Sequence, residues 1–305
     1  MKFLRYLLPA TLSLLIATNV GSQGLDLKGK AKGKISSFKD AKIHAYTQQF
    51  TDSINSFIKN NFENNKYLDF SIDTQEYLKP TFSIMSVNEI VKIDNGTIFN
   101  QTSINTHDGD ETINIGFGTR KLLNDNTIIF GANAFYDHQL TESHERVGVG
   151  VEAITSDFDL RYNHYSAMSG RRTNAEGTIE RALDGWDLRA DYHLPIDHDV
   201  NVFVSAFEFE NPESVSAYKE TGNKFGVDAK VGNFAIEAGY MDDNQENDAY
   251  FGNIKYVVNF GSDNQDHSSS NSKSLTDVSD QLYQPVKREN KIRVVKIDAS
   301  GVVVG

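Results

Sequence analysis

The chain has 305 residues, of which 39% are hydrophobic, and it carries a formal net charge of -12 with no cysteine. The lack of cysteine excludes disulfides, thiolate metal sites, a cysteine nucleophile and a lipidated N-terminal cysteine. The acidic balance argues against general nucleic-acid binding, which depends on a basic surface. The mean hydropathy of -0.45 excludes a bundle of transmembrane helices. Length alone favours about two domains, although a single barrel also reaches this size.

The N-terminus has the order of a secretory signal peptide. Lys2 and Arg5 precede an apolar run at 7–17, and small or polar residues follow. This run of about 11 residues is too short for a transmembrane anchor, which needs about 20. We therefore expect residues 1–22 to be removed during export.

Residues 23–66 are predicted to form a periplasmic leader followed by an amphipathic helix. The leader is rich in lysine and glycine and is interpreted as solvated, and contact with an anionic envelope polymer is the less favoured alternative. From about Phe38 to Asn65 apolar residues recur every three or four positions, as on one face of a helix. We interpret this apolar stripe as a docking face rather than a cofactor site.

From Tyr67 to Phe260 the hydrophobic period changes to two, which indicates β-strands. The pattern is clearest at 146–153, where valine or alanine alternates with arginine, glycine or glutamate. About twelve such strands are predicted, at 67–76, 81–92, 97–107, 111–122, 127–139, 144–154, 158–168, 184–194, 199–210, 221–231, 234–242 and 248–260.

The second face of these strands distinguishes an outer-membrane barrel from a soluble sandwich. In a sandwich the polar face contacts bulk water, whereas in a membrane barrel it lines a lumen and the apolar face contacts lipid. Here the polar face combines glycine with charges of both signs, and aromatic residues often lie near the ends of the apolar face. The residues predicted to face the lumen are Arg146, Glu152, Arg161, Asp187, Arg189, Asp191, Asp228 and Lys230.

The lengths of the connections support the same interpretation. The two longest, 169–183 and 211–220, each follow an odd-numbered strand and therefore lie at the same end of the sheet. Bacterial barrels have short periplasmic turns and longer outer loops. The predicted fold class is thus all-β, a twelve-stranded antiparallel transmembrane β-barrel with an N-terminal periplasmic helix.

The C-terminal part of the chain is predicted to be a linker followed by a short tail. A polar stretch rich in serine, asparagine and aspartate occupies 261–274. An ordered pattern then resumes, in which Ile292, Val294 and Ile297 alternate with charged residues. The barrel is therefore assigned to 67–260, the linker to 261–297 and the tail to 298–305.

Five motifs, spread in order over most of residues 40–297, form a specific combination, although one alternating strand alone would be a weak signal. They are Asn114-Ile-Gly-Phe-Gly-Thr-Arg120, Gly131-Ala-Asn-Ala-Phe-Tyr-Asp-His138, Arg146-Val-Gly-Val-Gly-Val-Glu152, Asp184-Gly-Trp-Asp-Leu-Arg189 with Leu194-Pro195, and Pro285-Val-Lys-Arg-Glu-Asn-Lys-Ile-Arg-Val-Val295. With these motifs the chain resembles the inverse autotransporter β-domain of the intimin and invasin family.

The resemblance implies a barrel whose N-terminus lies in the periplasm and whose linker re-enters the lumen to carry a C-terminal segment to the cell surface. Residues 283–297, extended at about 3.3 Å each, would span roughly 50 Å, more than the roughly 30 Å hydrocarbon core. We hypothesise that this segment plugs the pore. The residues expected in the pore are Pro285, Lys287, Arg288, Lys291 and Arg293.

Two departures from the family pattern limit what the resemblance implies. Family adhesins continue into immunoglobulin-like or lectin-like domains, whereas only the tail 298–305 follows the linker here. Adhesion through such a passenger is therefore not carried over. Residues 25–66 are also too short for the peptidoglycan-binding module of some relatives.

Two histidine pairs and one serine are candidates for chemical sites. His138 with His144, and His193 with His198, flank two turns without the spacing of a zinc motif. Ser166 lies two residues from His164, but no orienting partner can be assigned. We therefore expect no enzyme activity, cofactor or metal.

Two groups of charged residues have more than one interpretation. Asp187, Arg189 and Asp191 share a strand face and fit a salt-bridged lumen ladder better than an acid–base pair. Arg171 and Arg172 would contact lipopolysaccharide phosphates or remain ordinary solvated loop charges, and both interpretations stay open.

The expected function is that of an outer-membrane barrel that anchors and translocates its C-terminal segment. The alternative is a stand-alone pore or structural barrel in the same membrane. Expected partners are outer-membrane lipid and lipopolysaccharide and, by resemblance, the barrel-assembly machinery and periplasmic chaperones. Nucleic acid is not an expected partner.

Overall fold

The computed structural model describes residues 65–76, 78–107, 109–174, 177–196, 198–213, 218–245, 248–260 and 275–297. The predicted signal peptide, the leader with nearly all of its helix, the polar stretch at 261–274 and the tail at 298–305 lie outside these residues. Among the described residues, no helix combines the length and the hydropathy needed to cross a membrane.

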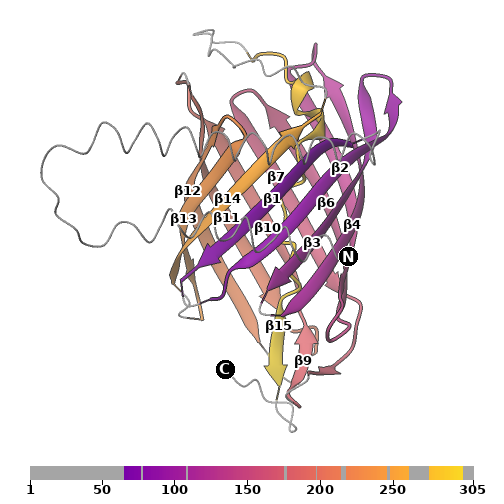
Figure 1. Cartoon of the computed structure of the whole chain (residues 1–305), viewed down its shortest axis with the longest axis vertical. Helices are drawn as coiled ribbons and strands as arrows, with labels where there is room; N and C mark the ends of the chain where they lie inside the picture. Colours follow the sequence, from indigo (N-terminus) through magenta and orange to yellow (C-terminus); the bar gives the residue numbers. More distant parts are fainter. Residues whose placement is uncertain are drawn as a thin grey trace, which may run out of the picture. The chain divides into compact units, whose positions relative to one another are not determined.

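Twelve strands close into one antiparallel barrel (Figure 1). Consecutive barrel strands pair throughout, with β7 beside β10, and β1 pairs with β14 to close the sheet. Every predicted strand begins and ends within two residues of the observed one, so the prediction of a twelve-stranded antiparallel barrel is confirmed. The barrel strands are β1 Asn65–Gln75, β2 Thr81–Ile93, β3 Gly96–His107, β4 Asp110–Leu123, β5 Ile128–Gln139, β6 Glu145–Thr155, β7 Phe158–Ala167, β10 Asp184–His193, β11 Asp199–Glu210, β12 Lys219–Val231, β13 Phe234–Asp243 and β14 Ala249–Asn259.

The remaining elements lie at the two ends of the barrel. A hairpin of β8 (Arg172–Thr173) and β9 (Ile179–Ala182) occupies the long connection predicted at 169–183, where the local pattern had indicated no strand. The C-terminal strand β15 (Val294–Ile297) pairs with β9. A 3₁₀ helix, η2 (Ser279–Tyr283), precedes β15. The hairpin was missed because its partner strand comes from the far end of the chain.

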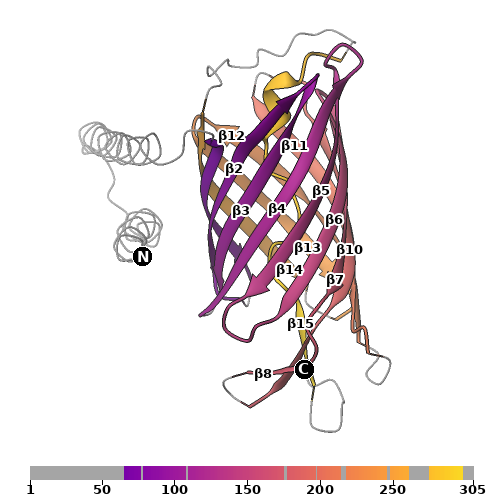
Figure 2. The same ribbon diagram turned by 90° about the vertical axis from the view of Figure 1, so that its right-hand side faces the viewer.

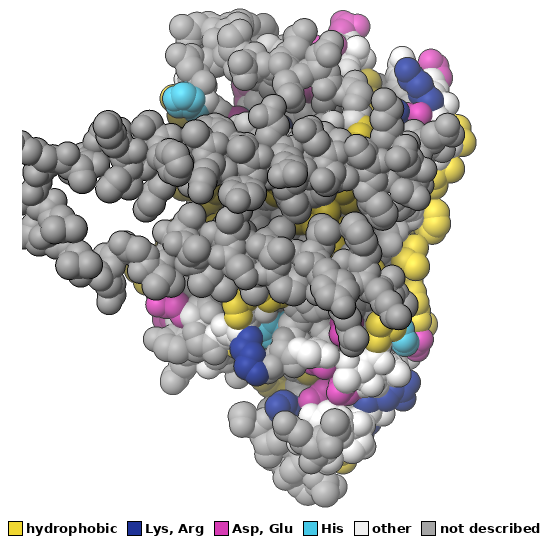
Figure 3. Space-filling model, viewed as in Figure 1, with side chains coloured by type: hydrophobic (Ala, Val, Ile, Leu, Met, Phe, Trp, Pro, Cys, Tyr) yellow, Lys and Arg dark blue, Asp and Glu magenta, His cyan; other side chains and the backbone are white. Residues whose placement is uncertain are grey.

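The alternation along each strand is the reverse of that in a soluble protein. In β4 the inward side chains of Asn114 and Arg120 are fully buried, whereas the outward Ile115 and Phe117 are 42% and 56% exposed. Where other atoms do not cover it, the right flank of the molecule in Figure 3 is hydrophobic. An exposed apolar surface of this extent is stable only in contact with lipid.

The two ends of the barrel differ in the length of their connections. At one end, here called the short-turn end, the strands are joined through 94–95, 124–127, 156–157, 194–198 and 232–233. Two of the three two-residue turns use a residue that tolerates a positive φ, Asn95 at 53° in 94–95 and Gly232 at 58° in 232–233. The opposite end, the long-loop end, carries the connections 168–183 and 211–218.

Candidate functional site: the lumen and the segment it holds

The linker, meaning here the described residues 275–297, runs through the inside of the barrel. Figures 1 and 2 both show it passing from η2 at one end, between the strands, to β15 at the other. It enters at the short-turn end, where the Val278 amide donates to the Asn126 carbonyl at 2.9 Å. It leaves at the long-loop end, where β15 pairs with β9. The lumen therefore holds an extended piece of the same chain.

Polar side chains of the lumen wall bind the backbone of the linker. Arg120 on β4 donates to the carbonyls of Leu282, at 2.8 Å, and Gln284. Gln101 on β3 accepts from the Val286 amide at 2.7 Å and donates to its carbonyl at 3.4 Å. Three further wall side chains donate to linker carbonyls. Asn163 donates to the carbonyl of Lys287 at 3.0 Å, Arg146 to that of Glu289 at 2.6 Å and Asn114 to that of Asn290 at 2.9 Å.

Basic side chains of the linker bind acidic groups of the wall. The guanidinium of Arg288 donates to both carboxylate oxygens of Asp137, at 2.8 and 2.7 Å. The ammonium of Lys287 lies 2.9 Å from Asp191 and 3.2 Å from Asp228. Arg293 pairs with Glu220 and with Glu289 of the linker itself.

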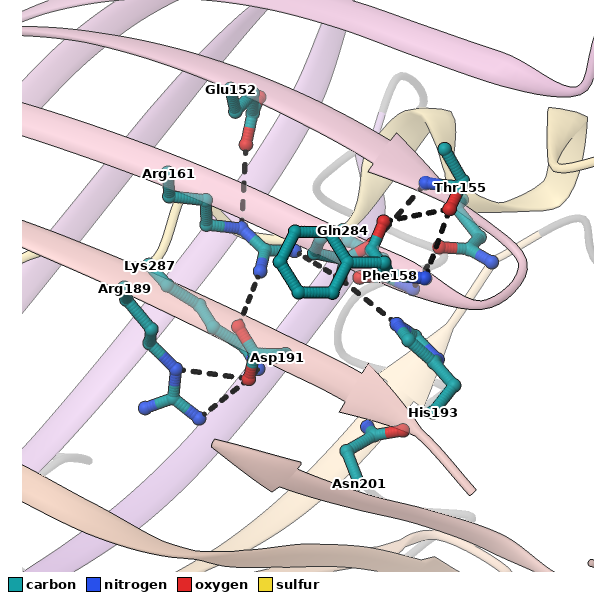
Figure 4. A network of polar contacts seen from close by, with 12 residues as sticks. Glu152, Thr155, Phe158, Arg161, Arg189, Asp191, His193, Asn201, Gln284 and Lys287 are labelled. Atoms are coloured by element: carbon teal, nitrogen blue, oxygen red, sulfur yellow. Dashed lines mark hydrogen bonds and ion pairs between the residues drawn. The ribbon is translucent and has the colours of Figure 1, made fainter. Parts of the chain in front are cut away.

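A ladder of charges follows the wall beside the linker (Figure 4). Arg161 lies 3.7 Å from Glu152 and 2.9 Å from Asp191, and Arg189 continues the ladder at 2.8 Å from Asp191. Asp187 does not pair with Arg189 and accepts instead from Tyr165 and Asn163. Because every rung joins opposite charges, groups that would be unstable alone in the lumen neutralise one another.

Five guanidiniums of this region also rest on aromatic rings that point inward. A cation over the face of a ring adds roughly 0.5–2 kcal/mol of attraction where water is excluded. The contacts, measured from guanidinium carbon to ring centroid, are Arg120 over Phe99 at 4.8 Å, Arg146 over Tyr165 at 4.4 Å, Arg189 over Phe203 at 3.7 Å, Arg288 over Phe135 at 4.3 Å and Arg293 over Phe209 at 4.5 Å.

At the long-loop end the surroundings of the linker become apolar. Val295 and Ile297 of β15 are 4% and 1% exposed. They belong to a hydrophobic cluster whose other buried members are Tyr165, Leu183, Phe207, Phe209 and Met241. Backbone pairing with β9 and this cluster together hold the exit of the linker.

The other residues predicted for the pore have less prominent places. Lys230 is exposed near the β12–β13 turn. Pro285 is half-buried between residues whose backbones the wall binds. Lys291 is half-buried, and its amide donates to the Glu289 carboxylate at 3.3 Å.

The four histidines flanking turns lie in different surroundings. His138 stacks on Tyr136 on the outer face of β5, with its Nδ1 3.8 Å from Glu145. His144, in the connection between β5 and β6, is fully buried against Ser169. His193 lies 3.2 Å from Asp159, and His198 is exposed in a turn.

The buried position of His144 affects its protonation. Burial, together with the nearby charges of Arg172 and Arg181, lowers the pKa of His144 to about 4. Glu180 lies 3.7 Å from its Nε2. The ring is therefore neutral at pH 7 and packs beneath the β8–β9 hairpin as an uncharged group.

Of the remaining residues considered from sequence, two belong to the outer surface and two to a loop. Ser166 and His164 lie on the outer face of β7. Arg171 pairs with Glu213 at 2.8 Å, and Arg172 donates to the Ser143 carbonyl. Within the described part of the chain, no group of three or more His, Cys, Asp or Glu residues could hold a metal ion.

Several wall residues that bind the linker are absent from the residues predicted to face the lumen, although three of them lie in the quoted motifs. They are Asp137, Asn114, Arg120, Gln101 and Tyr165. All of them lie at inward positions of the strand alternation, so the parity of the pattern was the signal that could have found them. Parity alone does not show which inward residues meet the linker.

Comparison with known proteins agrees with this architecture. The family model of the inverse autotransporter β-domain matches residues 15–290. The putative attaching and effacing protein homolog of Escherichia coli K12 is 39% identical over 100 residues, 32% of this chain and 34% of that protein. Invasin of Yersinia enterocolitica is 32% identical over 99 residues, 32% of this chain and 12% of invasin. The matched regions thus span about a third or less of these curated relatives.

A solved structure supports the fold independently. A chain from a study of the in-meso crystallization of membrane proteins superposes with a TM-score of 0.63 at 18% identity, covering 75% of this chain and 98% of that one. At this identity the likeness concerns the fold alone. Together with the family match, it shows that the chain belongs to the inverse autotransporter family and is an outer-membrane β-barrel of that type.

Proposed function

We propose that the barrel anchors the chain in the outer membrane and carries the segment that follows residue 297 to the cell surface. The observation that carries this proposal is the path of the linker, which enters at the short-turn end and leaves at the long-loop end. A chain that has moved through the lumen and stopped there would leave this arrangement.

The proposal includes the orientation of the barrel. Bacterial outer-membrane barrels place their short turns in the periplasm and their longer loops outside. The short-turn end would therefore face the periplasm, and the start of β1 at Asn65 lies at that end. The N-terminus would remain periplasmic while the C-terminus is exported.

The proposed partners follow from this location. They are outer-membrane lipid and lipopolysaccharide around the barrel, and the barrel-assembly machinery and periplasmic chaperones before insertion. No enzymatic role is proposed, because Arg161, Asp191 and Arg189 pair with one another and Asp187 is bound by Tyr165 and Asn163.

The test is the position of the C-terminus in intact cells. An epitope tag after Gly305 should be detected without permeabilisation, while a tag in the 194–198 turn should be detected only after it. A C-terminal tag that also needs permeabilisation would contradict translocation and favour a stand-alone barrel.

The role of the linker in closing the pore is tested separately. Deletion of 283–305 should raise single-channel conductance in planar bilayers, because it empties the lumen. Deletion of 298–305 alone is the matched control and should leave conductance low. Unchanged conductance in the longer deletion would show that the linker does not block the pore.

A further inference from the structure

We propose that the lumen wall contains a binding site for a single guanidinium group, that of Arg288, and that filling this site fixes the register at which the linker stops. This inference rests on the proposed function, because only a chain that moves through the lumen needs a stopping point. The site is formed by Asp137 and Phe135 of β5, Tyr165 of β7 and Gly148 of β6.

Most contacts between the wall and the linker carry no sequence information. Arg120, Gln101, Asn163, Arg146 and Asn114 bind main-chain groups of the linker. Every residue presents a carbonyl, so the same wall groups would bind whichever part of a passing chain lies opposite them. These contacts favour an extended chain in the lumen but do not select one register.

Among the basic side chains that the linker carries in the lumen, Arg288 is the most completely enclosed. Its side chain is 1% exposed, compared with 20% for Arg293 and 32% for Lys287. It makes a two-pronged contact with Asp137, a geometry that a lysine cannot reproduce. The ring centroids of Phe135 and Tyr165 lie 4.3 and 5.3 Å from its guanidinium carbon.

The barrel itself holds this site in shape. Arg146 and Asn114 donate to the two oxygens of Asp137, at 2.8 and 2.7 Å, and so fix the carboxylate that faces Arg288. A Cβ atom at Gly148 would lie 3.2 Å from the Arg288 guanidinium and 3.3 Å from Tyr165, so glycine leaves just enough room. Two partners of the Asp137 carboxylate therefore belong to the wall, and the linker supplies a third, the guanidinium of Arg288.

Strand pairing at the exit selects the register less strictly. β15 pairs with β9 over four residues. A slip of two residues keeps the same strand face inward, because side chains alternate with a period of two. Ile297 would then take the place of Val295 in the apolar cluster. A buried charge pair cannot slip in this way without leaving Asp137 short of its second cation.

The register can be measured by disulfide formation, since the chain has no cysteine of its own. Ala182 and Val294 are direct partners in the β9–β15 ladder, close enough for a disulfide between Ala182→Cys and Val294→Cys. If the linker retracts by two residues, position 296 replaces 294, and Ala182→Cys should instead join Lys296→Cys.

The decisive variant moves the arginine along the linker. In full-length chains carrying Arg288→Asn together with Asn290→Arg, the new arginine reaches the site only if the linker retracts by two residues. We expect the 182–296 disulfide to form and the 182–294 disulfide to fall several-fold. A purely structural role for Arg288 would not move the cross-link, so a bond that stays at 182–294 overturns the proposal.

Single substitutions supply the controls. Arg288→Ala and Asp137→Asn should each lower the 182–294 yield several-fold, whereas Lys296→Ala, which changes an exposed linker charge, should not. An unchanged yield in both site variants would overturn the proposal.

Heat-modifiable migration identifies the folded barrels, and Arg288→Lys tests the two-pronged contact if Arg288→Ala fails to fold. A C-terminal tag separates the outcomes: if it is absent from the surface, translocation fails, and if it is present with an unmoved cross-link, only the register site fails.

Discussion

The two parts of the linker are held by opposite kinds of chemistry. Inside the lumen, residues 282–293 are bound by hydrogen bonds and charge pairs, including the fully buried Asp137 and Arg288. At the exit, β15 is held by a strand ladder and by the burial of Val295 and Ile297 in an apolar cluster. The change occurs within a few residues along one extended chain.

The difference shows what each region can and cannot do. Because the lumen wall is polar and binds main-chain groups, a polypeptide can enter the lumen without contact with an apolar surface. Charged pairs in such a place are stable only when both partners are present. The apolar exit, in contrast, gains from excluding water and does not depend on charge. The lumen should therefore respond to charge substitutions and the exit to loss of side-chain volume.

The largest expected effect is from Asp137→Ala in the lumen. The substitution leaves the buried guanidiniums of Arg146 and Arg288 without their shared carboxylate. We expect the free energy of unfolding to fall by about 3–5 kcal/mol. Urea unfolding in detergent micelles measures this through the fluorescence of Trp186, which is the single tryptophan. Asp94→Ala, in an exposed turn, is the control, and an equal loss in both variants would contradict the buried-pair argument.

The next effect is expected at the exit. Ile297→Ala removes a side chain that is 1% exposed, and the loss of packing should destabilise the docking of β15 by about 2–4 kcal/mol. Proteolysis on intact cells should cut the linker near β15 faster, while the Arg288 contact in the lumen remains. If Ile297→Ala and Asp137→Ala gave the same cleavage pattern, the two regions would not act separately.

A smaller effect should appear on acidification of the long-loop end. Since the pKa of His144 is lowered to about 4 in the folded protein, an opened state with the usual value near 6.5 takes up a proton first as pH falls. Packing of the β8–β9 hairpin is thus full above about pH 6.5 and weakens by up to about 3 kcal/mol towards pH 4.

Hydrogen-exchange protection factors of β9, which correct for the intrinsic pH dependence of amide exchange, measure this effect. His144→Gln should remove the difference in these protection factors between pH 7 and pH 4.5, because glutamine does not titrate. The lumen strand β5 should show no comparable change over this range. A pH dependence that persists in the variant would place the titrating group elsewhere.

The smallest effect is expected for Lys287→Ala. Its ammonium pairs with Asp191 and Asp228, but the side chain is 32% exposed and the pairs are screened by water. We expect a loss of no more than about 1 kcal/mol, comparable to a surface ion pair. Urea unfolding of Lys287→Ala and Asp137→Ala under the same conditions compares the two losses of unfolding free energy. Similar losses would show that burial does not make the Asp137 contact stronger than the Lys287 contact.

Local sequence information was sufficient for the barrel strands. In β4, isoleucine and phenylalanine alternate with asparagine and glycine, and each residue type reports which side of the sheet it faces. The turn residues Asn95 and Gly232 mark where strands end at the short-turn end. The same alternation indicated the inward position of Asp191 and Arg161, which pair at 2.9 Å.

Contacts between distant parts of the chain could not be predicted in this way. Sequence showed that Arg288 and Asp137 are charged, but their pairing depends on how far the linker advances in the lumen. Asp187 illustrates the limit, because it shares a strand face with Arg189 yet binds Tyr165 of the neighbouring strand. The hairpin β8–β9 was missed for the same reason, since its ladder is completed by β15.

The sequence by itself determined an outer-membrane barrel, its strands and the side on which each residue lies, because the period of two is a local property of the backbone. Only the tertiary structure decided which inward residues bind the linker, where it stops and how its exit is sealed. These depend on closure of the barrel and on the position of a segment far from its partners in the sequence, with separations from 59 residues for Lys287 and Asp228 to 185 for Val286 and Gln101.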